Sequence, residues 1–254
     1  MPLPPKPLPT PVRALLCDAD GNLFPSEDPA FDASVAVTNR FLTRLGVDLQ
    51  YDAATLRREA LGRNFRALAG DLAREHGRHL DPTELDEQVD EEARVVTAHL
   101  ASVLRPDAAV GDVLRGLADR VRLALVSSSA LARLDACLQA TALADLFPEA
   151  DRFSAQDSLE VPTSKPDPAV YVLAARVLGV EPADALAVED ATAGVLSAVG
   201  AGIPVIGNLV FVPADERATR RAQLLDAGAH AVVDDWAGVH DLVTTSLTTP
   251  GDPR

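Results

Sequence analysis

The chain has 254 residues, a formal net charge of −15, 47% hydrophobic and 24% charged residues, and a sequence pI of about 4.6. This length can bury a substantial core, and the composition is that of a globular protein rather than a disordered one. The acidic balance argues against nucleic acid as a partner, because binding to a phosphate backbone needs clustered Lys and Arg. No apolar run approaches the roughly 20 residues that span a membrane, so no membrane partner is expected.

The two ends of the chain differ from the rest. Residues 1–11, "MPLPPKPLPTP", are rich in proline and lack the basic start and apolar core of a signal peptide. We expect a flexible leader here, a flexible tail at 248–254, and a cytoplasmic location. Cys17 and Cys137 lie far apart at no metal-ligand spacing, so both are predicted to be small core residues in a reducing compartment.

Short apolar runs recur along the chain and, in its second half, alternate with helical patterns. The first run, "VRALLC" at 12–17, ends directly before an acidic pair. Further strands are predicted at 121–126, 186–188, 203–206 and 231–233, and helices at 168–178, 192–200 and 215–227. Such alternation indicates parallel pairing through crossovers, so the expected fold class is α/β with a doubly wound sheet.

One interval, about residues 26–104, shows only helix signals. It includes Asp81 as a predicted N-cap, Pro82 in the first turn and Glu84 at the capping-box position. Gly46 and Gly77 stand where helices are expected to end. We therefore predict an inserted helical module with hinges near 24–27 and 105–107, above the carboxyl end of the sheet, where open α/β sheets bind ligands.

Polar residues gather where predicted strands end. The stretches concerned are Asp18 with Asp20, "VSSSA" at 126–130, "SKPDP" at 164–168 and "VEDATAG" at 188–194. Because the carboxyl ends of parallel strands meet along one edge, these stretches are expected to bring carboxylates, a hydroxyl and an ammonium together.

The acidic pair and the lysine are the most informative members of this set. Asp18 and Asp20 repel each other unless a positive group lies between them, and a bound cation is the obvious candidate. Lys165 is the only lysine outside the leader. A compact ammonium on a flexible stem can contact both a carboxylate and a phosphoryl oxygen, although a surface lysine left by chance is the alternative.

Four motifs in this order, with a helical insertion after the first, resemble the haloacid dehalogenase (HAD) superfamily of phosphohydrolases: Asp18-x-Asp20-Gly21, Ser127, Lys165 and Glu189-Asp190. The chain is most similar to the β-phosphoglucomutase and phosphoglycolate phosphatase-like branch, over about residues 12–235. The resemblance implies a mostly parallel, Rossmann-like core at 12–25 and 105–247 and a helical cap at 26–104. It also implies an enzyme that hydrolyses phosphoric monoesters.

The same resemblance implies roles for the acidic residues. Asp18 would be the nucleophile that forms an aspartyl-phosphate. Mg²⁺ would be held by the carboxylates of Asp18 and Asp190, the backbone carbonyl of Asp20, and Glu189 directly or through water. Asp20 would protonate the leaving group and later deprotonate the water that cleaves the intermediate.

The phosphate would be bound by the Ser127 hydroxyl, the Ser128 amide and the Lys165 ammonium. Whether Ser127 or Ser128 supplies the hydroxyl stays open, and either could instead cap a helix. Asp190 has the same helix-cap alternative, and Asp167 is expected to be the N-cap of the helix that starts at Pro168.

The helical insertion is expected to determine specificity. Its stretch "LGRNFRAL" at 61–68 resembles the family's substrate-reading loop and offers Arg63, Asn64 and Arg66 to a polar or anionic group. A solvated helical face is an equally good interpretation of these residues.

Asn22 departs from the family, which usually carries threonine at this position; we expect activity to survive. The main hypothesis is a Mg²⁺-dependent phosphatase of a small phosphorylated metabolite, such as a sugar phosphate or phosphoglycolate. A sugar phosphomutase is less favoured, since "PSEDPAF" has no histidine and the insertion has no lysine. A binding or regulatory protein that keeps the fold without turnover is the other alternative. The sequence leaves the oligomeric state open.

Overall fold

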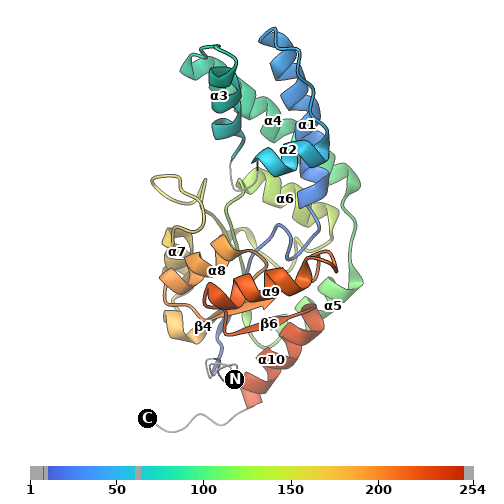
Figure 1. Ribbon diagram of the computed structural model, residues 1–254. Helices are drawn as coiled ribbons and strands as arrows, with labels where there is room; N and C mark the ends of the chain where they lie inside the picture. The colour runs from blue at the N-terminus through green and yellow to red at the C-terminus, as the bar shows by residue number, and fades with distance from the viewer. Residues whose placement is uncertain (1–7, 9–10, 61–63, 249–254) are drawn as a thin grey trace. The chain divides into compact units, whose positions relative to one another are not determined.

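The computed structural model describes residues 8, 11–60 and 64–248 of the chain (Figure 1). The chain divides into two compact units. We call Met1–Pro25 with Arg105–Arg254 the sheet unit, and Ser26–Leu104 the helical unit.

Among the described residues of the sheet unit, six parallel strands form one sheet in the order β3-β2-β1-β4-β5-β6. They are β1 (Ala14–Cys17), β2 (Arg122–Ser127), β3 (Arg152–Ser154), β4 (Ala185–Glu189), β5 (Val205–Asn208) and β6 (Ala231–Val233). In the centre of the sheet, Cys17 of β1 lies opposite Leu125 of β2 and Val188 of β4. The residues that directly follow β1 and β4 therefore leave the sheet next to each other.

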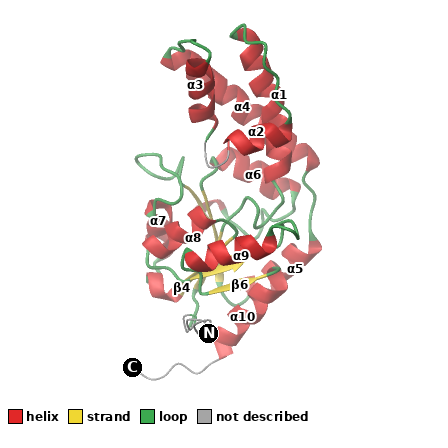
Figure 2. Ribbon diagram, in the orientation of Figure 1, coloured by secondary structure: helices red, strands yellow, loops and turns green. Residues whose placement is uncertain are grey.

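The central strands are buried on both faces, which explains their almost continuous apolar sequences. On one face, Ala14 and Leu16 belong to an apolar cluster with α7 (Ala169–Leu178), α8 (Thr192–Gly200) and α9 (Arg217–Asp226). Figure 2 shows α8 and α9 beside the strands labelled β4 and β6. Leu15 and Cys17 alternate to the other face and are also fully buried.

Three further helices complete the described part of this unit. They are α5 (Ala108–Ala118), α6 (Leu131–Ala140) and α10 (Trp236–Thr248). α5 contacts β2, α6 contacts β3, and α10 contacts α5, β5 and β6. Two short 3₁₀ turns, η1 (Glu149–Asp151) and η2 (Pro182–Asp184), lead into β3 and β4.

The predicted fold class is confirmed, because the predicted strands correspond to β1, β2, β4, β5 and β6 and the predicted helices to α7, α8 and α9. β3 was not predicted. It has three residues, begins with Arg152 and lies at the edge of the sheet, so it offers too few apolar positions to show a period.

The described elements of the helical unit are α1 (Glu27–Arg44), α2 (Ala53–Ala60), α3 (Phe65–Glu75) and α4 (Pro82–Val103). Phe41 and Leu42 of α1 form an apolar core with residues of α2 and α3. α1 also packs on α4, where Arg40 and Arg44 donate to the two carboxylate oxygens of Glu91 at 2.8 and 2.9 Å. The unit is thus held by an apolar core and by ion pairs between its two long helices.

The predicted start of α4 and the predicted ends of α1 and α3 are confirmed. Asp81 accepts a hydrogen bond from the Glu84 amide at 2.9 Å, and Glu84 accepts one from the Asp81 amide at 3.1 Å, which is a capping box. Gly46 and Gly77 follow the ends of α1 and α3 with φ of +71° and +65°, a conformation in which glycine carries no steric cost.

Cys17 and Cys137 are buried and form no disulfide, as predicted. Within the part of the chain that the structure describes, no helix is both long enough and apolar enough to cross a membrane.

Candidate active site

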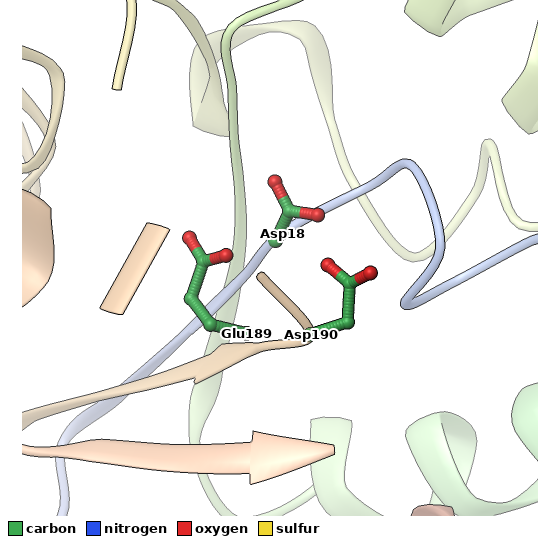
Figure 3. Close-up of side chains that lie close together, drawn as sticks. All are labelled: Asp18, Glu189 and Asp190. Atoms are coloured by element: carbon green, nitrogen blue, oxygen red, sulfur yellow. The ribbon is translucent and has the colours of Figure 1, made fainter. Parts of the chain in front are cut away.

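Three carboxylates meet at the carboxyl ends of β1 and β4. Asp18 directly follows β1, Glu189 is the last residue of β4, and Asp190 comes next. One carboxylate oxygen of each lies within 4.8 Å of the other two, and all three residues are buried. Figure 3 shows the carboxylates side by side above the strand ends. The register of β1 against β4 creates this cluster, and a bond from the Asp18 amide to the Val188 carbonyl at 3.0 Å extends the pairing to it.

Lys165 lies among these acids, as its predicted role requires. Its Nζ donates to Asp18 Oδ1 at 2.5 Å, to Glu189 Oε1 at 2.6 Å and to the Val126 carbonyl at 2.8 Å. Its side chain is only 7% exposed, so the alternative of a chance surface lysine is wrong. The three bonds use all three hydrogens of the ammonium.

Lys165 pairs with two of the three acids, Asp18 and Glu189. Burial raises the pKa of Asp18 to about 8, against the effect of Lys165 and with a further contribution from Glu189. Burial also disfavours the charged form of Lys165, but Asp18 and Glu189 outweigh it and raise the lysine pKa. A divalent cation beside Asp18 would favour the ionised carboxylate. The set of three close carboxylate oxygens therefore fits a hard divalent ion.

Two glycines make room for the carboxylates. A Cβ at position 21 would lie 2.3 Å from Asp190 Oδ2, and Gly21 has φ of +77°. A Cβ at position 194 would lie 1.8 Å from Glu189 Oε2. Any side chain at either position would displace a member of the acidic cluster.

Asn22, the departure from the family pattern, is fully buried and links the ends of β1 and β4. Its Nδ2 donates to the carbonyls of Asp18 at 3.0 Å and Val188 at 3.2 Å. Its Oδ1 accepts from Asn208 Nδ2 at 3.0 Å, and its own carbonyl accepts from Trp236 Nε1 at 2.9 Å. The side-chain amide of Asn22 thus holds the backbone of Asp18, which is one of the three acids, and of Val188, which precedes Glu189.

The Asp20 carboxylate is held by residues that the sequence analysis did not select. Its Oδ2 accepts from the Ser129 hydroxyl at 2.7 Å, and its Oδ1 accepts from Arg133 Nη2 at 2.7 Å. Arg133 lies on α6 and is one of many arginines, so no local signal distinguished it.

Ser127 ends β2 and is almost fully buried. Its Oγ accepts from the Ser129 amide at 3.0 Å, whereas the Ser128 Oγ accepts from the Lys165 amide at 3.0 Å. Ala130 is the N-cap residue of α6 and makes no side-chain cap bond, so neither serine caps that helix. Ser128 instead helps to fix the loop that carries Lys165.

Ala191, not Asp190, is the N-cap residue of α8, and it makes no side-chain cap bond. Asp167 was predicted to be the N-cap of α7; that position is occupied by Pro168. Asp167 Oδ1 nevertheless accepts a hydrogen bond from the Ala169 amide at 2.9 Å. It therefore binds the first turn of α7 from the position before the N-cap residue.

The candidate substrate-reading residues lie in the helical unit. Asn64 is the N-cap of α3 and accepts from the Ala67 amide at 2.9 Å. Arg66 pairs with Asp86 at 2.5 Å, and both side chains are about half exposed. Arg63 lies outside the described residues. A role of these three residues in substrate binding stays a prediction.

Tyr171 was also missed by the sequence analysis. It is fully buried on α7, and its hydroxyl donates to Glu189 Oε1. Burial and the nearby Glu189 raise its pKa well above the ordinary value, so the hydroxyl stays protonated. A tyrosine within an otherwise apolar helix needs a partner for its hydroxyl, which is the signal that could have identified it.

The fold and the acidic cluster define a class of protein: an α/β enzyme whose site lies at the carboxyl edge of a parallel sheet. Residues 12–202 match the family of haloacid dehalogenase-like hydrolases. The plasmid protein CbbY of Cupriavidus necator is 31% identical over 210 residues, covering 77% of this chain and 77% of that protein. The validoxylamine A 7'-phosphate phosphatase of Streptomyces hygroscopicus subsp. limoneus is 29% identical over 206 residues, covering 77% and 84%.

Among solved structures, CbbY from Rhodobacter sphaeroides in complex with xylulose-(1,5)bisphosphate has a TM-score of 0.68 and 24% identity, covering 89% of this chain and 95% of that chain. This likeness shows the fold. The match over residues 12–202 and the relative at 31% identity show the family, so the chain belongs to the haloacid dehalogenase-like hydrolases. The resemblance to the HAD superfamily and the prediction of a HAD-like hydrolase are confirmed.

Proposed function

We propose that this protein is a Mg²⁺-dependent phosphatase of a small phosphate monoester, of the sugar phosphate or phosphoglycolate type, acting through an aspartyl-phosphate on Asp18. The observation that carries the proposal is the contact of Lys165 with both Asp18 and Glu189 inside a buried acidic cluster. Such a cluster combines a nucleophile, a cation site and a fixed ammonium, which are the parts that phosphoryl transfer needs.

The names of the relatives support a phosphorylated small molecule as substrate. One relative is named as a phosphatase of validoxylamine A 7'-phosphate, and one structural neighbour was solved with xylulose-(1,5)bisphosphate. Both names give a phosphorylated compound. We propose the same class of substrate for this chain.

Asp18, Asp190 and the Asp20 carbonyl would hold Mg²⁺, with Glu189 bound directly or through water. When bound, the ion supplies positive charge that offsets repulsion between an anionic nucleophile and a phosphate dianion. The residues of this chain then orient the substrate: the Ser127 hydroxyl and the Ser128 amide would bind the non-bridging phosphoryl oxygens, and Lys165 would join them by giving up one of its three present hydrogen bonds.

Asp18 would attack phosphorus and form a bond to it, while the bond from phosphorus to the ester oxygen breaks. Asp20 would give its proton to the departing alkoxide. In the second half-reaction Asp20 would take a proton from water, whose oxygen attacks phosphorus and releases Asp18 and inorganic phosphate. Ser129 and Arg133 hold the Asp20 carboxylate in the present structure and so fix its starting orientation.

A panel of phosphorylated metabolites, incubated with the full chain and Mg²⁺, tests the proposal. We expect phosphate release from at least one sugar phosphate or phosphoglycolate-like ester, lost with a chelator and absent in Asp18→Asn. An isomerised sugar phosphate without phosphate release would indicate a mutase. No turnover of any ester, with binding retained, would indicate a binding or regulatory protein.

A further inference from the structure

Tyr171 connects the apolar core to the acidic cluster. It is 0% exposed and packs among aliphatic residues of β2, β4, α7 and α8, such as Val126, Ala187 and Val195. Its hydroxyl donates to Glu189 Oε1. A phenylalanine would fill the same apolar space, so packing alone does not account for the hydroxyl.

Glu189 is held through one of its two oxygens. Oε1 accepts from the Tyr171 hydroxyl and from Lys165 Nζ, which lies 5.2 Å from the centre of the tyrosine ring. Two donors fill the lone pairs of one carboxylate oxygen. None of the hydrogen bonds among the described residues ends on Oε2, so this oxygen keeps its lone pairs for another ligand.

The other side of the carboxylate is confined as well. Glu189 Oε2 lies 1.8 Å from the point that a Cβ of residue 194 would occupy, in the first turn of α8. Gly194 leaves this space to the carboxylate. The bonds from Tyr171 and Lys165 and the space at Gly194 together define where the Glu189 carboxylate lies.

We infer that Tyr171 is a positioning residue for the cation: its hydroxyl fixes Glu189 so that Oε2, directly or through a water, serves the ion that Asp18 and Asp190 hold. The inference rests on the proposed metal site. A partner that orients a metal ligand typically changes affinity by about 10–100-fold when it is removed. Tyr171→Phe deletes only the hydroxyl and leaves the ring in the core.

The chain offers a matched control, because it contains two tyrosines. Tyr51, in the helical unit, also donates its hydroxyl to a glutamate, Glu59, at 2.7 Å. Isothermal titration of the metal-free full chain with Mg²⁺ should show affinity at least about tenfold weaker in Tyr171→Phe, and wild-type affinity in Tyr51→Phe. Wild-type affinity in a folded Tyr171→Phe protein would overturn the inference.

A second measurement does not depend on the folding of that variant. Wild-type protein labelled with 3-fluorotyrosine gives two ¹⁹F resonances, which Tyr51→Phe assigns. We expect Mg²⁺ to shift the Tyr171 resonance and to leave that of Tyr51 in place. A Tyr171 resonance that stays unchanged at saturating Mg²⁺ would contradict the role.

Both experiments measure metal binding in the absence of substrate. A negative result for Tyr171 can therefore be told apart from a failure of the phosphatase proposal. Tyr171-dependent Mg²⁺ binding without turnover of any ester would remove the proposed reaction and keep the inference. Phosphate release with equal Mg²⁺ affinity in wild type and Tyr171→Phe would keep the proposed reaction and overturn the inference about Tyr171.

Discussion

Lys165 Nζ lies 2.5 Å from Asp18 Oδ1, although the two residues are 147 positions apart in the chain. The contact is almost entirely shielded from solvent, with side-chain exposures of 7% and 10%. Lys165 forms ion pairs with both Asp18 and Glu189. Its removal would leave buried negative charge without compensation.

We therefore expect Lys165→Met to lower the free energy of unfolding of the metal-free protein by about 3–5 kcal/mol, the usual cost of removing one partner of a buried ion pair. Mg²⁺ should recover part of this loss, because an ion that binds only the folded state stabilises it. Urea unfolding with and without Mg²⁺ measures both effects. Lys165→Arg is the control that keeps the charge, and equal stability of Lys165→Met and wild type would contradict the contact.

Gly194→Ala should disturb the site without affecting the rest of the fold. The new methyl would overlap Glu189 Oε2, so we expect weaker Mg²⁺ binding and slower phosphate release. Gly116 is the matched control: it lies in α5, and nothing lies within 4 Å of the place a Cβ would take. Gly116→Ala should retain metal affinity and gain up to about 1 kcal/mol of stability from helix propensity. Equal metal affinity in the two variants would argue against the position of Glu189.

Asn22 and Asn208 form a buried amide pair between the β1 end and β5. Asn208→Ala leaves the Asn22 oxygen without this donor, so the free energy of unfolding should fall by about 1–3 kcal/mol. A double-mutant cycle with Asn22→Ala measures the pair itself, and we expect a coupling of at least about 0.5 kcal/mol. Additive effects of the two substitutions would show that the contact carries no energy.

Sequence patterns were sufficient for the parts of the site that lie at strand ends. Asp18 and Glu189 follow or end apolar runs, and parallel pairing alone brings such residues to one edge. Asn208 and Tyr171 gave a weaker signal: a polar group in an apolar strand or helix indicates that it needs a hydrogen-bond partner, but the sequence does not say which residue that partner is. Their roles come from contacts with residues 186 and 18 positions away, which only the packed structure provides.

In the helical unit, Glu91 forms ion pairs with Arg40 and Arg44, and their contribution to stability should depend on pH. Hydrogen bonds from Arg40 and then Arg44 hold the pKa of Glu91 below its ordinary value. A carboxylate with a lowered folded-state pKa stabilises the fold above its unfolded pKa, and this contribution disappears as the pH falls through the folded value. Because the arginines are half exposed, we expect about 0.5–1 kcal/mol at neutral pH.

Urea unfolding of wild type and Glu91→Gln over a range of pH tests this expectation. The difference between them should be largest near neutral pH and vanish in acid. Glu87→Gln, at an exposed position on the same helix, is the control for the loss of a charge alone. A difference between wild type and Glu91→Gln that stays constant across the pH range would mean that the ion pairs do not contribute.

In the proposed mechanism Asp18 carries the phosphoryl group while Asp20 moves the proton. p-Nitrophenol leaves without needing an acid, so Asp20→Asn should accept phosphate from p-nitrophenyl phosphate but hydrolyse the intermediate about 10²–10⁴-fold more slowly. Mass spectrometry of acid-quenched, Mg²⁺-loaded Asp20→Asn protein is then the most direct test. We expect one phosphoryl group on the peptide that contains Asp18, and none in a folded Asp18→Asn, Asp20→Asn double variant. Phosphate release by Asp18→Asn at the wild-type rate, or a phosphoryl group on a different peptide, would contradict it.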